Sequence, residues 1–218
     1  MKIIPYARQE ISLKDINNVS KTLKSDFITQ GPEIEKFEKN ICNFTGAKYS
    51  VAVNSATSGL HISCLTLGLN TGDYLWTSPN SFVASSNCAL YCGAKIDFVD
   101  IDEKSFNICP KKLEEKLKKT TPKKLPKILV IVHFGGNPCE LKKIRKLSKI
   151  YNFKIIEDAS HAIGSKYEKL HIGNCKFSDF TVFSFHPVKI ITTGEGGMVL
   201  TNNKKYFNKL SLYRNHGI

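Results

Sequence analysis

One lysine differs from the many others in this sequence because of the residues around it. Lys189 lies in SFHPVKIITTGEGG (residues 184–197), where a proline and three glycines shape the backbone. A lysine that is held in place and partly shielded from water has a lowered pKa, and its neutral amine can act as a nucleophile or a base. Lys189 is therefore a candidate for Schiff-base chemistry with a bound carbonyl compound, a weak signal until it is combined with residues at other strand ends.

Two further stretches suit an anion and a flat ring. Residues 54–59 read NSATSG and follow an expected strand; small residues, hydroxyl groups and a helix N-terminus together favour a bound anion. Phe82 is the first large aromatic residue after the next expected strand. Both features also have ordinary explanations, because NSATSG could be only a helix N-cap and Phe82 could pack in the core.

A carboxylate and a serine occur at the ends of two more expected strands. Asp158 ends the stretch KIIED, and Ser184 follows an apolar run shortly before Lys189. An acidic residue at the end of a parallel strand is not needed for packing. Asp158 could instead cap the segment that follows it, so its position alone leaves both interpretations open.

Strands and helices alternate along the chain with short connections. This alternation predicts an α/β fold with a mostly parallel central sheet and helices on both faces. Ligands of such folds bind outside the carboxyl ends of the strands, so the four stretches should meet there. The expected strands are 49–53, 73–77, 96–100, 127–134, 154–158, 179–185 and 197–201; the expected helices are 12–25, 32–45, 57–69, 82–91, 110–119, 139–151 and one from about 203.

An aromatic, anionic cofactor that forms a Schiff base would use all four stretches. Pyridoxal 5'-phosphate has these properties. Its phosphate would lie against NSATSG, its ring on Phe82 and its pyridine nitrogen beside Asp158, and its aldehyde would react with Lys189. The four features together, in this order, therefore favour a pyridoxal phosphate enzyme.

The composition favours a reduced, cytoplasmic protein. The formal net charge is +13, but only three of the 32 basic residues are arginine, and no basic stripe with interleaved aromatic residues occurs; nucleic-acid binding is therefore not expected. No run of about 18 apolar residues predicts a membrane span, and no secretory signal is apparent. The seven cysteines are scattered; Cys88 and Cys92 share a helical face, which core packing explains better than a metal site.

The sequence resembles the sugar aminotransferases of the DegT/DnrJ/EryC1/StrS family, of fold type I. The resemblance covers the whole chain, and the stretch around Lys189 is highly specific to the family. The residues that carry it are PYARQEI (5–11), FITQGP (27–32), NSATSGLH (54–61), KIDFVDID (95–102), EDASHAIGS (157–165) and SFHPVKIITTGEGG (184–197).

The resemblance implies roles for the matching residues. Lys189 would be the catalytic lysine that binds the cofactor covalently, and Asp158 would pair with the pyridine nitrogen. Ring stacking is implied for Phe82, and a polar contact near the ring oxygen for His161. The phosphate-binding residues would be Ala56, Thr57, Ser58 and Ser184, and the sugar-nucleotide contacts Tyr6, Asp26, Phe27, Ile28 and Thr29.

The resemblance also implies the reaction and the assembly. The enzyme would transfer an amino group from glutamate to C4 of a UDP-4-keto-6-deoxy-N-acetyl sugar, in nucleotide-sugar biosynthesis of the pseudaminic acid type, and it would be a homodimer when full length. Family members continue well beyond residue 218. Residues 1–218 are thus expected to form an N-terminal segment plus the cofactor-binding large domain, without the C-terminal small domain.

Two other functions stay open within this resemblance. Some family members are pyridoxal phosphate-dependent sugar dehydratases, which typically lose the lysine that is present here as Lys189. The chain could also be a non-catalytic remnant that binds the cofactor without turnover.

Overall fold

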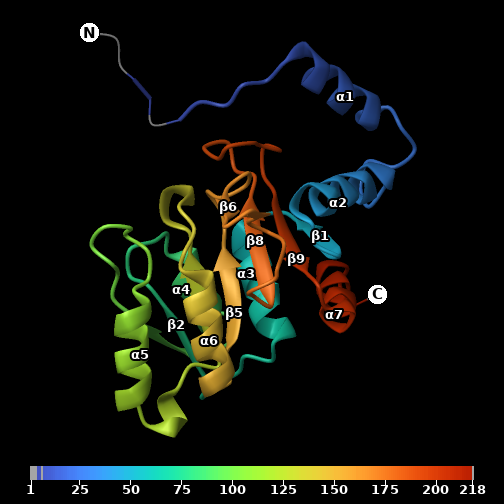
Figure 1. Cartoon of the computed structure of the whole chain (residues 1–218). Helices are drawn as coiled ribbons and strands as arrows, with labels where there is room; N and C mark the ends of the chain where they lie inside the picture. Colours follow the sequence, from blue (N-terminus) through green and yellow to red (C-terminus); the bar gives the residue numbers. More distant parts are fainter. Residues whose placement is uncertain (1–3, 6, 218) are drawn as a thin grey trace.

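The computed structural model describes residues 4–5 and 7–217. A central sheet is packed between helices, with α2 (Pro32–Thr45) beside the sheet, while α1 (Leu13–Leu23), the described residues before it and its connection to α2 extend away from this body as an N-terminal arm (Figure 1). Ser12 and Asp15 form the reciprocal hydrogen bonds of a capping box at the start of α1. Pro32 begins α2, and Gly46 ends it with a left-handed φ of 82°. Both helix starts were predicted from the sequence.

The central sheet has seven strands in the order β1-β9-β8-β5-β4-β2-β3. All of the neighbouring pairs are parallel except those of β9, which runs antiparallel to both β1 and β8. The strands are β1 (Tyr49–Val53), β2 (Tyr74–Thr77), β3 (Lys95–Phe98), β4 (Ile128–Val132), β5 (Lys154–Asp158), β8 (Phe180–Ser184) and β9 (Gly197–Thr201).

Helices cover both faces of this sheet. Along β4, Ile128 and Val130 face one apolar cluster while Leu129 and Ile131 face another, as the two-residue period of a strand requires. The first cluster includes residues of α3 (Ala56–Thr66), α4 (Ala84–Leu90) and α7 (Lys204–Arg214), and the second includes residues of α2, α5 (Pro110–Lys119) and α6 (Leu141–Tyr151). A strand buried on both faces reads as a continuous apolar run, which explains sequences such as ILVIV.

The structure differs from the sequence expectation in several details. Helix α4 starts at Ala84 rather than at residue 82, β3 ends at Phe98 rather than at residue 100, and β4 ends at Val132 rather than at residue 134. A short hairpin of β6 (Lys166–Tyr167) and β7 (Leu170–His171) and two 3₁₀ turns, η1 (Pro122–Lys124) and η2 (Phe134–Gly136), were not predicted. Such two- and three-residue elements have no period that a sequence pattern can reveal.

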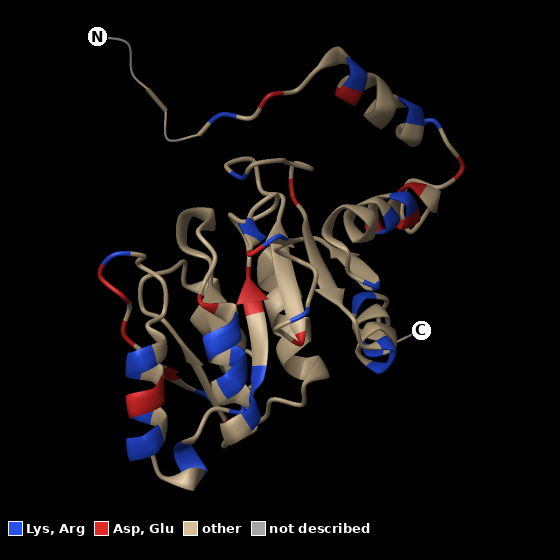
Figure 2. Cartoon of the chain, viewed as in Figure 1, with Lys and Arg blue, Asp and Glu red and all other residues tan. Residues whose placement is uncertain are grey.

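The positive charge of the chain is spread over the helix surfaces. Figure 2 shows lysine and arginine along the visible surfaces of α5 and α6, with acidic residues among them on α5. Many of these lysines form ion pairs, such as Lys112 with Asp100 and Lys118 with Glu114, both at 2.6 Å. The charge thus belongs largely to solvated helix faces, as the interleaved glutamates of the sequence indicated.

Two further properties bear on the class of protein. None of the described helices is both long and apolar enough to cross a bilayer. All seven cysteines are free thiols, and Cys88 is fully buried against α3 and its neighbours, as core packing predicted.

Candidate functional site

The residues predicted to bind the cofactor lie at the carboxyl ends of the parallel strands, at the point where β9 runs in the opposite direction. Gly197, the first residue of β9, pairs with Val53 on one side and with Ser184 on the other. This cross-strand row brings the turn after β1 close to the end of β8, although the two segments lie about 130 residues apart in the sequence.

The turn after β1 leads into helix α3, and its backbone lies in close contact with Gly197 of β9. The hydroxyl of Ser55 accepts a hydrogen bond from the Ser58 amide at 3.1 Å, so NSATSG does act as an N-cap. A Cβ atom on Gly197 would lie only 2.6 Å from the carbonyl carbon of Ser55 and 2.7 Å from the amide nitrogen of Ala56. The glycine therefore lets the first turn of α3 approach the sheet, with Ala56, Thr57 and Ser58 in that turn and Ser184 beside it.

Asp158 ends β5 with its side chain almost fully buried. Only 5% of the residue is exposed. Its Oδ2 accepts a hydrogen bond from the Ser85 hydroxyl at 2.6 Å, and its Oδ1 accepts one from the Ser160 hydroxyl at 2.6 Å and one from the Ser160 amide at 3.2 Å. Asp158 forms no ion pair with any of the residues that the structure describes. The carboxylate is thus oriented by neutral donors and retains lone pairs for a cationic partner.

Lys189 lies in the loop that joins the antiparallel strands β8 and β9. The amide of Phe185 donates to the Gly196 carbonyl at 2.9 Å, and the Thr193 amide donates to the Phe185 carbonyl at 3.0 Å. The Thr192 hydroxyl also donates to the Phe185 carbonyl, at 2.9 Å. These bonds close the base of the loop, and they explain why threonines and glycines follow the lysine.

The Lys189 amine contacts His161, which lies in the turn after β5. Nζ of Lys189 is 2.8 Å from Nε2 of His161. Burial lowers the pKa of the half-buried Lys189, and the carboxylate of Asp158 offsets part of that effect. Burial, and then the charge of Lys189, lower the pKa of His161, with Asp158 again acting in the opposite direction. A neutral His161 can accept a hydrogen bond from the amine, so the two side chains are suited to exchange a proton.

Phe82 lies two residues before the start of α4, and its exposure excludes the core interpretation, while its role in ring stacking stays a prediction. It is 75% exposed, so it is not a core residue. The carbonyl of Phe82 accepts from the amide of Ser85, whose hydroxyl binds Asp158. Phe82 thus lies within one helical turn of a residue that contacts the buried carboxylate, with its ring free to cover a ligand.

The structure does not bring the predicted sugar-nucleotide residues to this site. Residues 26–29 (Asp26, Phe27, Ile28 and Thr29) are exposed in the connection between α1 and α2, on the arm that extends from the body (Figure 1). Among the described residues, no hydrogen bond joins them to the other predicted site residues. Tyr6 lies outside the described residues. A role for these five residues in substrate binding stays a prediction.

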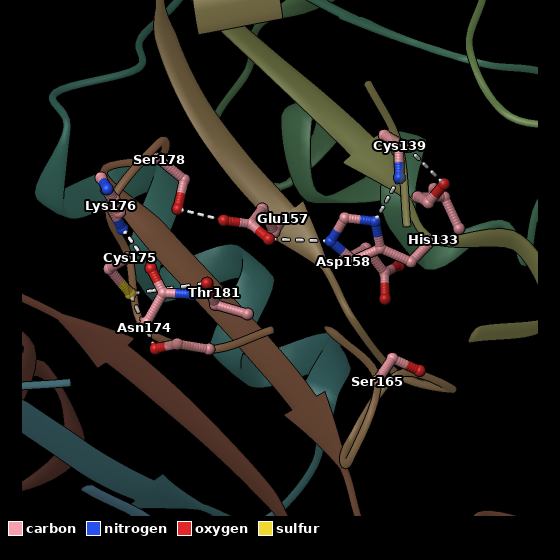
Figure 3. Close-up of polar contacts among 12 residues, drawn as sticks. His133, Cys139, Glu157, Asp158, Ser165, Asn174, Cys175, Lys176, Ser178 and Thr181 are labelled. Atoms are coloured by element: carbon pink, nitrogen blue, oxygen red, sulfur yellow. Dashed lines mark hydrogen bonds and ion pairs between the residues drawn. The ribbon is translucent and has the colours of Figure 1, made fainter. Parts of the chain in front are cut away.

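Several residues that shape the site were not singled out from the sequence. Ser85 and Ser160 orient Asp158. Gly197 was expected only to shape the Lys189 loop, and the structure shows that it also makes room for the turn after β1. Behind the site, His133 and Glu157 form a buried pair (Figure 3). A sequence signal existed only for Ser160, which lies two residues after Asp158, within reach of a local side-chain hydrogen bond. Ser85 lies 73 residues from Asp158, so no local pattern could reveal its contact.

Comparison with known proteins shows which family this chain is similar to. The DegT/DnrJ/EryC1/StrS aminotransferase family matches residues 9–218. The chain is 43% identical over 216 residues to a UDP-4-amino-4,6-dideoxy-N-acetyl-beta-L-altrosamine transaminase of Campylobacter jejuni subsp. jejuni serotype O:23/36, a match that covers 99% of this chain and 56% of the relative. The chain thus spans about half the length of the curated relatives it matches.

Solved structures agree with this match. Helicobacter pylori PseC, an aminotransferase involved in the biosynthesis of pseudoaminic acid, superposes with a TM-score of 0.89 at 33% identity over 99% of this chain and 57% of its own. NtdA from Bacillus subtilis, with bound cofactor PMP, gives a TM-score of 0.82 at 32% identity over 93% of this chain and 45% of its own. The fold is therefore that of the fold type I aminotransferases, and the chain belongs to the DegT/DnrJ/EryC1/StrS aminotransferase family.

Proposed function

We propose that this chain forms the cofactor-binding part of a pyridoxal phosphate-dependent nucleotide-sugar aminotransferase. The observation that carries the proposal is the convergence of Lys189, Asp158 and the first turn of α3 at one edge of the sheet, within a family of aminotransferases. The NtdA structure, which contains PMP, supports the choice of cofactor.

The residues present fit this cofactor on two independent observations. Asp158 is a buried carboxylate held by neutral donors, with no lysine or arginine bound to it in residues 4–5 and 7–217. Such a group suits a cationic ring nitrogen. Gly197 keeps the start of α3 open and close to the sheet, where helix amides and the hydroxyls of Thr57, Ser58 and Ser184 suit a phosphate.

The chemistry of the reaction is divided between the cofactor and the chain. When bound, pyridoxal phosphate supplies an electron sink for the carbon that loses a proton. Asp158 would keep a proton on the ring nitrogen by offering a buried negative charge. Phe82 would cover one face of the ring, and the hydroxyls at the start of α3 would hold the phosphate end.

In the proposed reaction, Lys189 takes up and returns the proton of the reacting carbon. Its lowered pKa leaves a larger neutral fraction at neutral pH than an ordinary lysine has, so Nζ can attack a carbonyl carbon or take a proton from the α-carbon of the amino donor. His161 accepts a hydrogen bond from Nζ and so orients the amine. The closed base of the loop keeps Nζ within the site during both halves of the reaction.

The proposal extends to substrates and assembly. We take glutamate as the amino donor and the C4 carbonyl of a UDP-4-keto-6-deoxy-N-acetyl sugar as the acceptor, as in pseudaminic acid biosynthesis. The Campylobacter jejuni relative, whose name is that of a UDP-amino-sugar transaminase, supports the choice of acceptor. The choice of glutamate rests only on the resemblance of the sequence to the family. We also propose a cytoplasmic homodimer, with residues 1–218 as an N-terminal segment plus large domain; the free thiols are in keeping with a reducing compartment.

A coupled assay tests the function. The chain would be incubated with pyridoxal phosphate, glutamate and the UDP-linked keto sugar, and amino-sugar and 2-oxoglutarate formation would be followed by mass spectrometry. Formation of both products supports aminotransferase activity. Cofactor binding without transfer would support a non-catalytic remnant only if a protein of the relatives' full length also fails to transfer the amino group. Loss of a sugar hydroxyl without amino transfer would support a dehydratase.

Gly197→Ala should weaken binding of the phosphate end of the cofactor. The new Cβ atom would clash with backbone atoms of Ser55 and Ala56, which can move only by shifting the start of α3. We expect affinity for pyridoxal phosphate to fall about tenfold or more, which is about 1.4 kcal/mol. Affinity for pyridoxal, which lacks the phosphate, should change far less. Equal losses for both compounds in absorbance titrations would contradict a phosphate site at this turn.

The reaction of Lys189 with the cofactor should have a low pH midpoint. Because burial lowers the pKa of Lys189, the amine becomes neutral at a lower pH than an ordinary lysine, whose pKa is about 10.4. Borohydride trapping of the adduct across a pH series should therefore give a midpoint below that of Nα-acetyl-lysine. Since Asp158 raises the pKa, Asp158→Asn should move the midpoint further down. A midpoint equal to that of acetyl-lysine would show that Lys189 is not perturbed.

A further inference from the structure

A buried polar cluster lies directly behind the site. Glu157 precedes Asp158 in β5, so its side chain points to the opposite face of the sheet. Glu157 is 2% exposed and His133, which follows β4, is 1% exposed. Nε2 of His133 lies 2.8 Å from Oε2 of Glu157, and the hydroxyl of Ser178 donates to Oε1 (Figure 3). We call Glu157, His133 and Ser178 the Glu157 cluster.

The protonation of His133 follows from a main-chain hydrogen bond. The amide of Cys139 points at Nδ1 of His133 over 3.1 Å, and an amide can only donate. Burial lowers the pKa of His133, but its contacts with Cys139 and Glu157 outweigh burial and raise the pKa to about 10, which favours a doubly protonated ring. The main-chain donor at Nδ1 occupies the lone pair that a second ring proton would need, so we assign one ring proton, on Nε2, which is donated to Glu157. Both carboxylate oxygens thus receive a donor, and no lysine or arginine of the described chain pairs with Glu157. Glu157 places a buried negative charge one residue from Asp158.

Stability alone does not explain such a cluster. A buried carboxylate that is balanced only by hydrogen bonds is costly, and apolar side chains of similar volume would often be as stable or more so. The surrounding face of the sheet is apolar, with Ile131, Ile155 and Phe183 in the same layer. The polar cluster interrupts this layer at the end nearest the site.

The same residues connect the cluster to Asp158. The His133 amide donates to the Asp158 carbonyl at 3.1 Å, while the His133 side chain binds Glu157. His133 therefore holds two successive residues of β5, one through the main chain and one through the side chain. These bonds hold the end of β5 at the last residue pair of β4 and β5, which is Val132 with Asp158.

We propose that Glu157 and His133 are positioning residues, which hold the end of β5 so that the Asp158 carboxylate meets the ring nitrogen of the cofactor. This inference rests on the proposed function, because Asp158 needs a bound pyridine ring to be positioned against. Neither residue contacts the ring; both act through Asp158. The charge of Glu157 adds to the negative potential at this end of the sheet.

Glu157→Gln tests the inference, with Asp179→Asn as a matched control. The glutamine side chain keeps the shape of the glutamate but loses the charge and one acceptor. Asp179 also carries a largely shielded carboxylate, with 8% of its side chain exposed, but it precedes β8 at the opposite end of the sheet. There it accepts from the Ile155 amide at 3.0 Å and pairs with Arg145. Both changes remove a buried charge, and only the first is near Asp158.

The readouts are cofactor affinity, the pH midpoint of the absorbance of bound pyridoxal phosphate, and the thermal midpoint without cofactor. Glu157→Gln should weaken the affinity about tenfold, as changes behind a metal ligand do. It should also move the absorbance midpoint to lower pH, because a negative charge that favours the protonated chromophore is lost. Asp179→Asn should change affinity less than about twofold under conditions where both variants are folded.

Three outcomes distinguish failure of this inference from failure of the proposed function. If Glu157→Gln lowers the thermal midpoint but keeps wild-type affinity and absorbance midpoint, the cluster is only structural and the inference is wrong. If that variant does not fold, Ser178→Ala takes its place: it removes one donor to Glu157 and should weaken cofactor affinity about threefold, and wild-type affinity would overturn the inference. If the unmodified chain binds no pyridoxal phosphate, the proposed function itself fails, and the inference with it.

Discussion

Lys189→Ala should abolish covalent attachment of pyridoxal phosphate and lower amino transfer about 10³-fold or more, the range that a general acid–base residue contributes. No other described amine takes its place in the contact with His161. The fold should be retained, because the loop is closed by main-chain and threonine hydrogen bonds rather than by the lysine. Absorbance of the bound cofactor and the coupled transfer assay measure the two effects.

Two matched variants show whether the loss is specific. Lys189→Arg keeps a positive charge that cannot be removed near neutral pH, so it should be as inactive as the alanine variant. Lys127→Ala removes another partly buried lysine, which pairs with Asp73 at 2.7 Å, far from the site. It should keep covalent attachment and activity, even if the protein becomes less stable. Wild-type labelling of the Lys189→Ala variant would show that a different amine reacts.

Asp158→Asn should lower amino transfer about 10²- to 10³-fold, the size that a preorganised electrostatic contact commonly contributes. Asparagine can accept from Ser160 at Oδ1, and its Nδ2 can donate to the Ser85 hydroxyl, which then acts as the acceptor. It has no charge with which to keep the ring nitrogen protonated. The main effect should therefore be on turnover, with cofactor affinity reduced as well. Steady-state rates with glutamate and the keto sugar check the first expectation.

The stability of the Asp158→Asn variant distinguishes a functional carboxylate from a structural one. Because Asp158 is buried without a cationic partner in the described chain, removing its charge should not lower the thermal midpoint of the cofactor-free protein. Asp179→Asn removes a carboxylate that forms an ion pair. This change should lower the thermal midpoint of the cofactor-free protein and leave turnover nearly unchanged. A loss of stability in Asp158→Asn that matches its loss of activity would contradict the proposed role.

The sequence predicted those parts of the fold that depend on local patterns. Buried strands such as ILVIV, capped helices such as α1 and α2, and the alternation of the two gave the correct class of sheet. The reversal of β9 was not predicted, because an apolar run such as GMVLT has no feature that sets its direction. That reversal matters, since it makes the Lys189 loop a hairpin connection between β8 and β9.

The site was predictable where a residue type and a strand end were enough. Asp158 and Ser184 end strands as expected, and Lys189 follows in a loop whose residues explain its closure. The Glu157 cluster was not predictable, because it depends on the pairing of β4 with β5 and on a contact between residues 24 positions apart. The arm residues 26–29 matched only a family pattern, and nothing in their local sequence places them in space.

Borohydride reduction of the chain with bound pyridoxal phosphate, followed by proteolysis and mass spectrometry of the labelled peptide, tests the central claim most directly. We predict a single stable label, on the peptide that contains Lys189. A label on another lysine, or no label at saturating cofactor, would contradict the assignment of this site.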